Sequence, residues 1–324
     1  MLAVNGVRQN TRFPLIILMG PTAIGKTDVA LAICQHFPVE IVSVDSAQVY
    51  RHLDIGTAKP SKAILEEVPH WLIDVVDPSD IYNAARFVND ANYAIQQIRQ
   101  KGKIPLLVGG SMMYFNALIN GLSDLPPASA KVREKLNSQA ELEGLESLYD
   151  RLKSIDFHTA SRVHPRQRHR VLRALEVFEL TGIPLSELQA QKHSTSLMHP
   201  LDIYQIGLWP SDRTLLHRRI EERFESMLNR GFCDEVQNLY VRGDLNPDLP
   251  AIRAVGYRQI WGFLQGAYGL ETAKSLSIFA SRQLAKRQLT WMRRWSDLNI
   301  EHVNPLSDRE KLKKNILNRL KKHV

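Results

Sequence analysis

The chain has 324 residues, a hydrophobic content of 44% and a charged content of 23%, which is ordinary for a soluble globular protein with more than one folding unit. Its two cysteines, Cys34 and Cys233, exclude a disulfide framework and a CxxC metal site, and they favour a reducing, cytoplasmic setting. The longest apolar run near the N-terminus, residues 15–19, is too short to span a bilayer or to form a signal core. The first 150 residues are slightly acidic, so the remainder carries all of the net charge of +8. This asymmetry suggests that the second part meets a polyanion, with a merely soluble basic surface as the alternative.

The chain carries a phosphate-binding motif of the type G-x4-G-K-T in residues 20–27. An apolar segment that predicts a buried strand precedes it, and apolar residues at helical spacing follow it. A glycine turn in that position directs backbone N–H groups and the positive end of a helix dipole at one anion. Lys26 adds a positive charge, and the Thr27 hydroxyl can bind a phosphate-held Mg2+. We expect a di- or triphosphate site, rather than a coincidental turn, formed by Gly20, Pro21, Thr22, Ala23, Ile24, Gly25, Lys26 and Thr27.

Apolar segments separated by helical patterns predict a doubly wound α/β sheet. In such a sheet, ligands bind at the carboxyl ends of the strands. The expected strands are residues 15–19, 40–44, 71–76, 104–108 and, much later, 203–208.

The sequence becomes entirely helical between about residues 130 and 190 before the last expected strand. We therefore expect a P-loop NTPase-like core formed by residues 1–122 and 198–324, interrupted by an all-helical insertion domain over 123–197. The expected helices are 131–144, 146–153 and 166–181 in the insertion, and 215–231, 276–295 and 309–322 in the C-terminal part.

Two strand ends beside the phosphate loop carry candidate functional residues. Asp45 follows the second strand, where its carboxylate could act as a general base, as an outer ligand of Mg2+ or as a helix N-cap. Gly109 and Gly110 follow the fourth strand and would let a ligand approach the backbone closely. Ser111 then either projects a hydroxyl into the same crevice or caps the next helix.

Two basic clusters contain no acidic residue, whereas an ordinary solvated face mixes both signs. Arginines with nearby aromatic rings suit phosphate contacts and base stacking. Arg219 and Arg223, one helical turn apart, could present two cations to one phosphate. The histidines of the first cluster lack partners at metal spacing, so no zinc site is expected. The clusters comprise Arg162, His164, Arg166, Arg168, His169, Arg170 and Arg173, and Arg282, Lys286, Arg287, Trp291, Arg293, Arg294 and Trp295.

These motifs together resemble those of the tRNA dimethylallyltransferase family, also called tRNA isopentenyltransferases, along almost the whole chain. The usual Gly-Gly-Thr of the family is Gly109-Gly110-Ser111 here, and residues 164–170 are more basic than the family form. The zinc finger of some eukaryotic relatives is absent, which is typical of the compact bacterial type. The matching blocks are GPTAIGKT at 20–27, VDSAQVYRHLDIGTAKP at 44–60, PLLVGGSMMY at 105–114, RALEVFELTG at 173–182, the PSDR and RIEERFESML run at 210–228, AVGYRQIW at 254–261 and RQLAKRQLTWMR at 282–293.

The resemblance implies transfer of a dimethylallyl group from dimethylallyl diphosphate to the exocyclic amine of the adenine 3'-adjacent to the anticodon. In that reaction Asp45 would remove the amine proton, while Thr22 and Ser111 would orient the diphosphate and the adenine. Lys26, Arg219 and Mg2+ would neutralise the leaving diphosphate. The adenine must leave its stack to react.

The resemblance further implies that the anticodon stem-loop of tRNA is the partner, with no membrane or protein partner and a monomeric, cytoplasmic enzyme. A P-loop small-molecule kinase, an adenylate prenyltransferase and a noncatalytic RNA-binding protein are the alternatives. The expected tRNA-binding residues are Asp45, Ser46, Ala47, Gln48, Ser111, Arg133, His169, Arg170, Val171, Leu172, Arg173, Arg253, Ala254, Val255, Gly256, Tyr257, Arg258, Lys286, Arg287, Gln288, Trp291 and Arg293.

Overall fold

The computed structural model describes residues 13–190, 201–304 and 309–323. The chain forms two compact units, one of Met1–Leu118 with Leu197–Val324 and one of Ile119–Ser196. Among the described residues, none of the helices combines the length and the apolar character needed to cross a bilayer.

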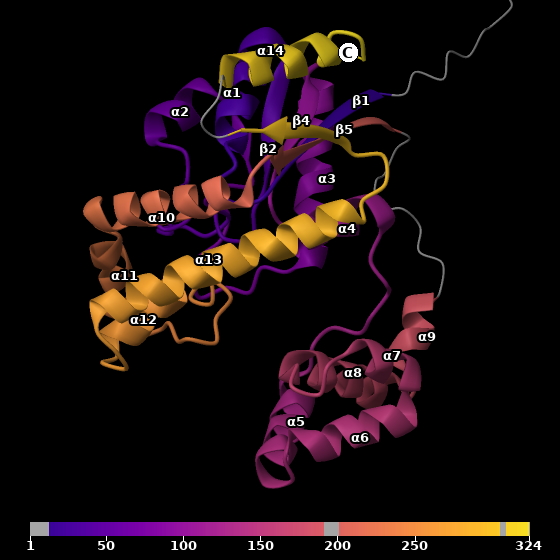
Figure 1. Ribbon diagram of the computed structural model, residues 1–324. Coiled ribbons are helices and arrows are strands. Elements are labelled where there is room, and N and C mark those ends of the chain that lie inside the picture. Colours follow the sequence, from indigo (N-terminus) through magenta and orange to yellow (C-terminus); the bar gives the residue numbers. More distant parts are fainter. Residues whose placement is uncertain (1–12, 191–200, 305–308, 324) are drawn as a thin grey trace, which may run out of the picture. The chain divides into compact units, whose positions relative to one another are not determined.

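The first unit contains a six-stranded, all-parallel sheet in the order β3-β2-β4-β1-β5-β6 (Figure 1). Strand β1 lies between β4 and β5, and Ile16 pairs with Leu106 on one side and with Tyr204 on the other. Parallel strands require crossover connections, and here helices supply them, which confirms the expected doubly wound α/β class. The strands are β1 (Phe13–Met19), β2 (Val39–Val44), β3 (His70–Trp71), β4 (Ile104–Gly109), β5 (Leu201–Pro210) and β6 (Asn299–Val303).

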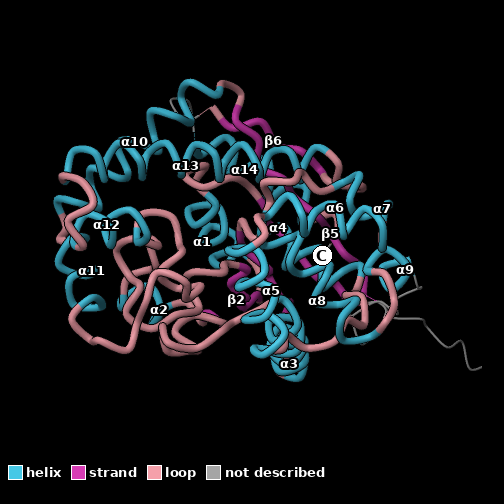
Figure 2. The backbone as a smooth tube through the Cα atoms, turned by 90° about the horizontal axis from the view of Figure 1, so that it is seen from below, coloured by secondary structure: helices cyan, strands magenta, loops and turns pink. Residues whose placement is uncertain are grey.

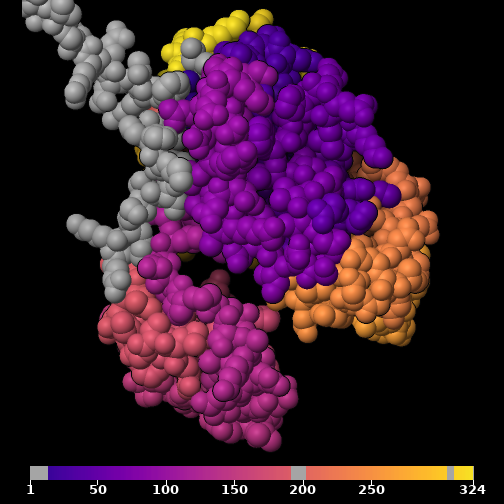
Figure 3. Space-filling model, turned by 180° about the vertical axis from the view of Figure 1, so that it is seen from behind, coloured from indigo at the N-terminus to yellow at the C-terminus, as the bar shows by residue number. Residues whose placement is uncertain are grey.

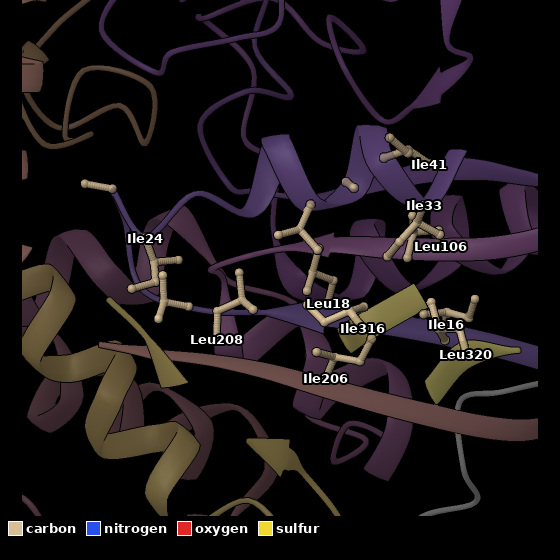
Figure 4. Close-up of a cluster of buried hydrophobic side chains, with 14 of the residues drawn as sticks. Ile16, Leu18, Ile24, Ile33, Ile41, Leu106, Ile206, Leu208, Ile316 and Leu320 are labelled. Carbon is tan, nitrogen blue, oxygen red and sulfur yellow. The ribbon is translucent and has the colours of Figure 1, made fainter. Parts of the chain in front are cut away.

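Helices of the first unit cover both faces of this sheet because alternate residues of its buried strands point to opposite sides. Ile16 and Leu18 of β1 pack against Ile33 of α1 and Ile316 of α14 on one face (Figure 4). Helix α3 contacts β2 and β4, and none of its buried side chains belongs to this cluster, so it covers the other face. The helices are α1 (Lys26–His36), α2 (Lys62–Glu67), α3 (Ala84–Gln100), α4 (Met112–Asn120), α10 (Arg213–Asn229), α11 (Phe232–Tyr240), α12 (Tyr257–Leu264), α13 (Leu270–Arg293) and α14 (Arg309–Leu320).

Helices α10 to α13 form a group at one side of the sheet (Figures 1 and 2). Helix α13 contacts both α10 and α12, and α11 contacts α10 and α12. Figure 3 shows these helices, in orange, lying directly against the N-terminal part of the chain, in indigo and violet. Residues far apart in the sequence are thereby brought to the same edge of the sheet.

The second unit is entirely helical in its described part and has its own core. Leu136, Leu148, Leu152, Val171 and Leu175 are buried together at its centre. The Asp156 side chain accepts hydrogen bonds from the N–H groups of Thr159 and Ser186, at 2.9 and 2.8 Å, which caps the helix Phe157–Arg162 and ties the helix Leu185–Ala190 to it. The helices are α5 (Ala130–Leu142), α6 (Leu145–Ile155), α7 (Phe157–Arg162), α8 (Arg168–Thr181) and α9 (Leu185–Ala190).

The prediction of a strand over residues 71–76 is wrong beyond Trp71, where β3 ends. Leu72 and Asp74 adopt positive φ angles of 65° and 56°, which turn the chain out of the extended conformation. Val76 pairs again only in a single parallel bridge with Tyr50.

Strand β6 was not expected from the sequence. It is an edge strand in which only Glu301 and Val303 are buried, so its pattern lacks the apolar run that marks the inner strands. Helix α13 also begins at Leu270, earlier than the expected start at residue 276.

Candidate active site

The phosphate-binding motif folds as the expected turn between β1 and α1. Gly25 has a φ angle of 105°, which an L side chain rarely adopts, and it directly precedes the first residue of α1. The N–H groups at the start of α1 therefore point toward the loop opening, where the helix dipole is positive.

A cavity of about 530 Å³ opens at this edge of the sheet and is lined entirely by residues of the first unit. Thr22, Lys26, Asp45 and Arg219, four of the five expected catalytic residues, line it. The lining also includes Thr27, Gln48 and Arg223. Ser111, the fifth, is not part of the lining but directly follows Gly110, which is; its Oγ accepts a hydrogen bond from the Ser46 N–H at 3.0 Å.

Lys26 turns back onto its own loop. Its Nζ donates to the carbonyl oxygens of Gly20 and Pro21, each at 2.9 Å. The pKa of Lys26 is lowered to about 8, mainly by burial; the negative charge of Asp45 opposes this shift, and the positive charge of Arg223 adds to it. An anion in the cavity would restore the full charge of this amine.

Binding of inorganic pyrophosphate is expected to weaken as the pH rises through about 8, because Lys26 loses its charge there. Lys26→Arg keeps a positive charge throughout this range. We expect the ratio of parent to variant affinity, measured by calorimetry between pH 7 and 9.5, to fall with pH. A constant ratio would show that Lys26 does not titrate in this range.

The two carboxylate oxygens of Asp45 differ in their hydrogen bonds. Oδ1 accepts from the N–H groups of Ala47 and Gln48, at 2.9 and 3.3 Å, and so caps the turn that follows β2. No described residue donates a hydrogen bond to Oδ2. The capping role and a chemical role are therefore compatible, since each uses a different oxygen.

Arg219 and Arg223 of α10 both reach the cavity, as their spacing predicts. Arg219 donates from Nη1 to the Ile24 carbonyl at 3.2 Å, next to the phosphate loop. Arg223 donates from Nη2 to the Thr57 carbonyl at 3.3 Å. Burial lowers the pKa of Arg223, with Asp45 opposing this shift, so the arginine lies in a partly desolvated position.

Gln288 of α13 joins two loops of the site, a role that the sequence did not reveal. Its Oε1 accepts from the Thr22 N–H and its Nε2 donates to the Gly110 carbonyl, both at 2.9 Å. A Cβ atom on Gly110 would lie 2.4 Å from Nε2, so the bridge requires a glycine there. Gln288 is buried, and both the oxygen and the nitrogen of its amide take part in this bridge.

The other expected tRNA-binding residues fall into two sets. In the first unit, Lys286, Arg287, Trp291 and Arg293 are exposed on α13, as are Arg253 and Arg258 near α12. Ala254, Val255 and the buried Tyr257 line the cavity, and Gly256 lies between them in the sequence.

In the helical unit, His169 and Arg170 are exposed, and Leu172 is half-buried. Arg133 and Arg173 instead hold Glu176, a carboxylate that is only 1% exposed, at 2.9 and 2.7 Å. Val171 is buried in the core of this unit, so its side chain cannot make the contact expected of it.

The cavity offers oxygen donors suited to Mg2+, but not a complete protein site. Thr27 and Asp28 are exposed to the cavity, and Asp45 lines it too. Among the described residues, no group of three or more His, Cys, Asp or Glu side chains could hold a metal ion. A cation here would therefore depend on phosphate oxygens for most of its ligands.

This fold and cavity define a P-loop-like α/β protein whose phosphate-binding motif lies beside a carboxylate. The sequence matches the IPP transferase family over residues 48–295. The chain belongs to this family.

Similar proteins cover nearly the whole chain. The tRNA dimethylallyltransferase of Alkalilimnicola ehrlichii is 53% identical over 90% of both chains, and that of Coxiella burnetii is 50% identical over 87% of this chain and 90% of its own. The solved tRNA isopentenylpyrophosphate transferase of Bacillus halodurans is 34% identical, with a TM-score of 0.70 over 95% of this chain and 96% of its own. A eukaryotic dimethylallyltransferase acting on tRNA is 27% identical, with a TM-score of 0.77 over 96% of this chain and 80% of its own.

Proposed function

We propose that this chain transfers a dimethylallyl group from dimethylallyl diphosphate to the exocyclic amine of the adenine 3'-adjacent to the anticodon in tRNA. The observation that carries the proposal is a single cavity in which Lys26, Arg219 and Arg223 face the carboxylate of Asp45. The names of the similar proteins support the same reaction.

The reaction needs two kinds of assistance, and the cavity offers both. The bond between the allylic carbon and the diphosphate oxygen breaks, and the electron pair leaves with the diphosphate, so cations and backbone N–H groups must stabilise the growing negative charge. Lys26, Arg219 and Arg223 supply the side-chain charges. Mg2+, held by the Thr27 hydroxyl and the diphosphate itself, would add to this neutralisation when bound.

The adenine amine is a weak nucleophile because its lone pair is delocalised into the ring. As its nitrogen forms the new bond to carbon, a proton must leave, and Oδ2 of Asp45 is the base that we assign to it. Thr22 orients the diphosphate from the loop. The Ser111 hydroxyl, next to the N–H of Ser46, orients the adenine.

We assign tRNA binding to the exposed cations of α13 and of the helical unit, with the anticodon stem-loop as the part that is held. Between residues 281 and 296 no acidic residue interrupts the basic run. Trp291 is exposed in this run and can stack on an unpaired base. We place this activity in the cytoplasm, in a monomer, where both free cysteines stay reduced.

The test of the proposed function is a mass spectrum of tRNA nucleosides from cells with and without this protein. Isopentenyladenosine is expected only in the first. The purified protein should also prenylate tRNA from dimethylallyl diphosphate without ATP. Phosphorylation of a small acceptor by ATP, with no prenylated tRNA, would instead identify a kinase.

The affinity for tRNA is expected to fall steeply with salt, because phosphate contacts release counterions. Arg287→Gln and Arg170→Gln should each reduce the slope of log affinity against log salt by about one. Arg218→Gln is the matched control, since Arg218 is an exposed arginine paired with Glu222 at 2.8 Å. A slope that Arg287→Gln and Arg170→Gln leave unchanged would argue against both clusters.

A further inference from the structure

The loop from Asp54 to Lys59 forms one wall of the active-site cavity. Gly56, Thr57 and Ala58 line the cavity directly. The carbonyl oxygen of Thr57 accepts from Arg223 Nη2 and from Gln48 Nε2, each at 3.3 Å. The position of this one carbonyl therefore helps to set the direction of the Arg223 guanidinium.

Glu235 of α11 holds this loop from a distant part of the chain. Its Oε2 accepts from the N–H groups of Asp54 and Ile55, at 3.1 and 2.6 Å. Its Oε1 accepts from the Gly56 N–H at 3.1 Å and from the Tyr257 hydroxyl. Four donors on one carboxylate, three of them successive N–H groups, leave the loop little freedom, because bonds to a charged acceptor are strong.

Two further features keep the loop in this conformation. Lys59, at its other end, donates to the Asp54 carboxylate at 2.6 Å and to the Tyr50 carbonyl at 3.0 Å. A Cβ atom on Gly56 would lie 2.1 Å from the ring of Phe232, so the loop packs directly on α11. The loop therefore lies so close to α11 that no residue larger than glycine fits at position 56.

An acidic residue in the first turn of a helix often serves only to complement the helix dipole. Asp234 and Glu235 both lie in the first turn of α11, but only Glu235 is turned toward the loop and bonds to its backbone. The dipole alone does not explain this arrangement.

We infer that Glu235 is a positioning residue for the diphosphate, acting through the 54–59 loop and the Thr57 carbonyl on Arg223. The inference rests on the diphosphate-binding role proposed above for Arg223. If the carboxylate is changed, the carbonyl is free to shift, and Arg223 loses the acceptor that directs it toward the phosphate loop.

The first measurement is the affinity for inorganic pyrophosphate, by calorimetry, in Glu235→Gln. An amide has a single acceptor oxygen, so one side of the loop loses its acceptor, and we expect binding to weaken about 5- to 20-fold. Tyr257→Phe removes only the hydroxyl contact and should weaken binding less. Asp234→Asn removes the same charge from the same turn and should leave affinity unchanged. Thermal unfolding of each variant verifies that it is folded.

A double-mutant cycle separates positioning from general destabilisation. If Glu235 acts through Arg223, then Glu235→Gln should change pyrophosphate affinity less than about twofold once Arg223→Gln is present. If the two substitutions weaken pyrophosphate affinity by factors that simply multiply in the double variant, the inference is overturned while the role of Arg223 stays intact. Unchanged affinity in Arg223→Gln alone would overturn the role proposed for Arg223, and the inference with it.

Discussion

Asp45→Asn is expected to lower the turnover of prenyl transfer by about a hundredfold or more, the scale for a lost general base. Asparagine keeps an oxygen that can accept from the N–H groups of Ala47 and Gln48, so the turn after β2 should persist. Only the basic oxygen is replaced. The measurement is the single-turnover rate of prenyl transfer to saturating tRNA.

The matched measurement for this variant is tRNA affinity by fluorescence anisotropy, which should stay within about threefold of the parent, because the phosphate contacts that dominate affinity are elsewhere. Asp45→Ala should lose both the base and the cap, so its turnover should fall at least as far, while tRNA still binds. A parental turnover rate in Asp45→Asn would remove this residue from the chemistry.

Lys26→Met is expected to reduce kcat/KM for dimethylallyl diphosphate by about 10²- to 10³-fold, as for the loss of one preorganised donor to a developing anion. Methionine keeps the aliphatic stem and removes the charge. Because the fold already lowers the pKa of Lys26 to about 8, its charged form is disfavoured relative to the unfolded chain at neutral pH. The melting temperature of Lys26→Met should therefore be no lower than that of the parent.

A clear drop in melting temperature would show that the bonds from Lys26 to Gly20 and Pro21 stabilise the loop more than desolvation disfavours the amine. In that case the lost activity would report a disordered loop rather than a missing charge. The N–H of Thr22 in the same loop bonds to Gln288, so its rate of hydrogen exchange measures independently how ordered the loop is.

Local patterns predicted the parts of the molecule that depend on local geometry. The phosphate loop was recognised because its glycines and Lys26 have fixed spacing, and the inner strands because they are continuous apolar runs. The apolar residues around Asp74 are compatible with a strand, yet Leu72 and Asp74 adopt positive φ angles that no local apolar pattern predicts. β6 is too polar to be recognised as a strand, since it pairs only at the sheet edge.

Long-range contacts explain why the sequence did not predict the roles of several residues. Gln288 matched a tRNA-contacting block, but its amide bonds to loops more than 170 residues away. Glu235 carried no signal at all, because its partners are backbone N–H groups, which every sequence has. Arg133 and Arg173 look like surface cations until the buried Glu176 is placed between them.

The resting place of Lys26 bears on how the enzyme completes a catalytic cycle. Its ammonium group is held by two carbonyl oxygens of its own loop, so an arriving diphosphate exchanges partners with the lysine rather than meeting an unsatisfied cation. The free energy gained when the diphosphate binds is correspondingly smaller, and the free energy needed to release it is smaller by the same amount. An enzyme that must release pyrophosphate after every transfer benefits from this exchange of partners, because the contacts that bind the diphosphate do not slow the release of the product.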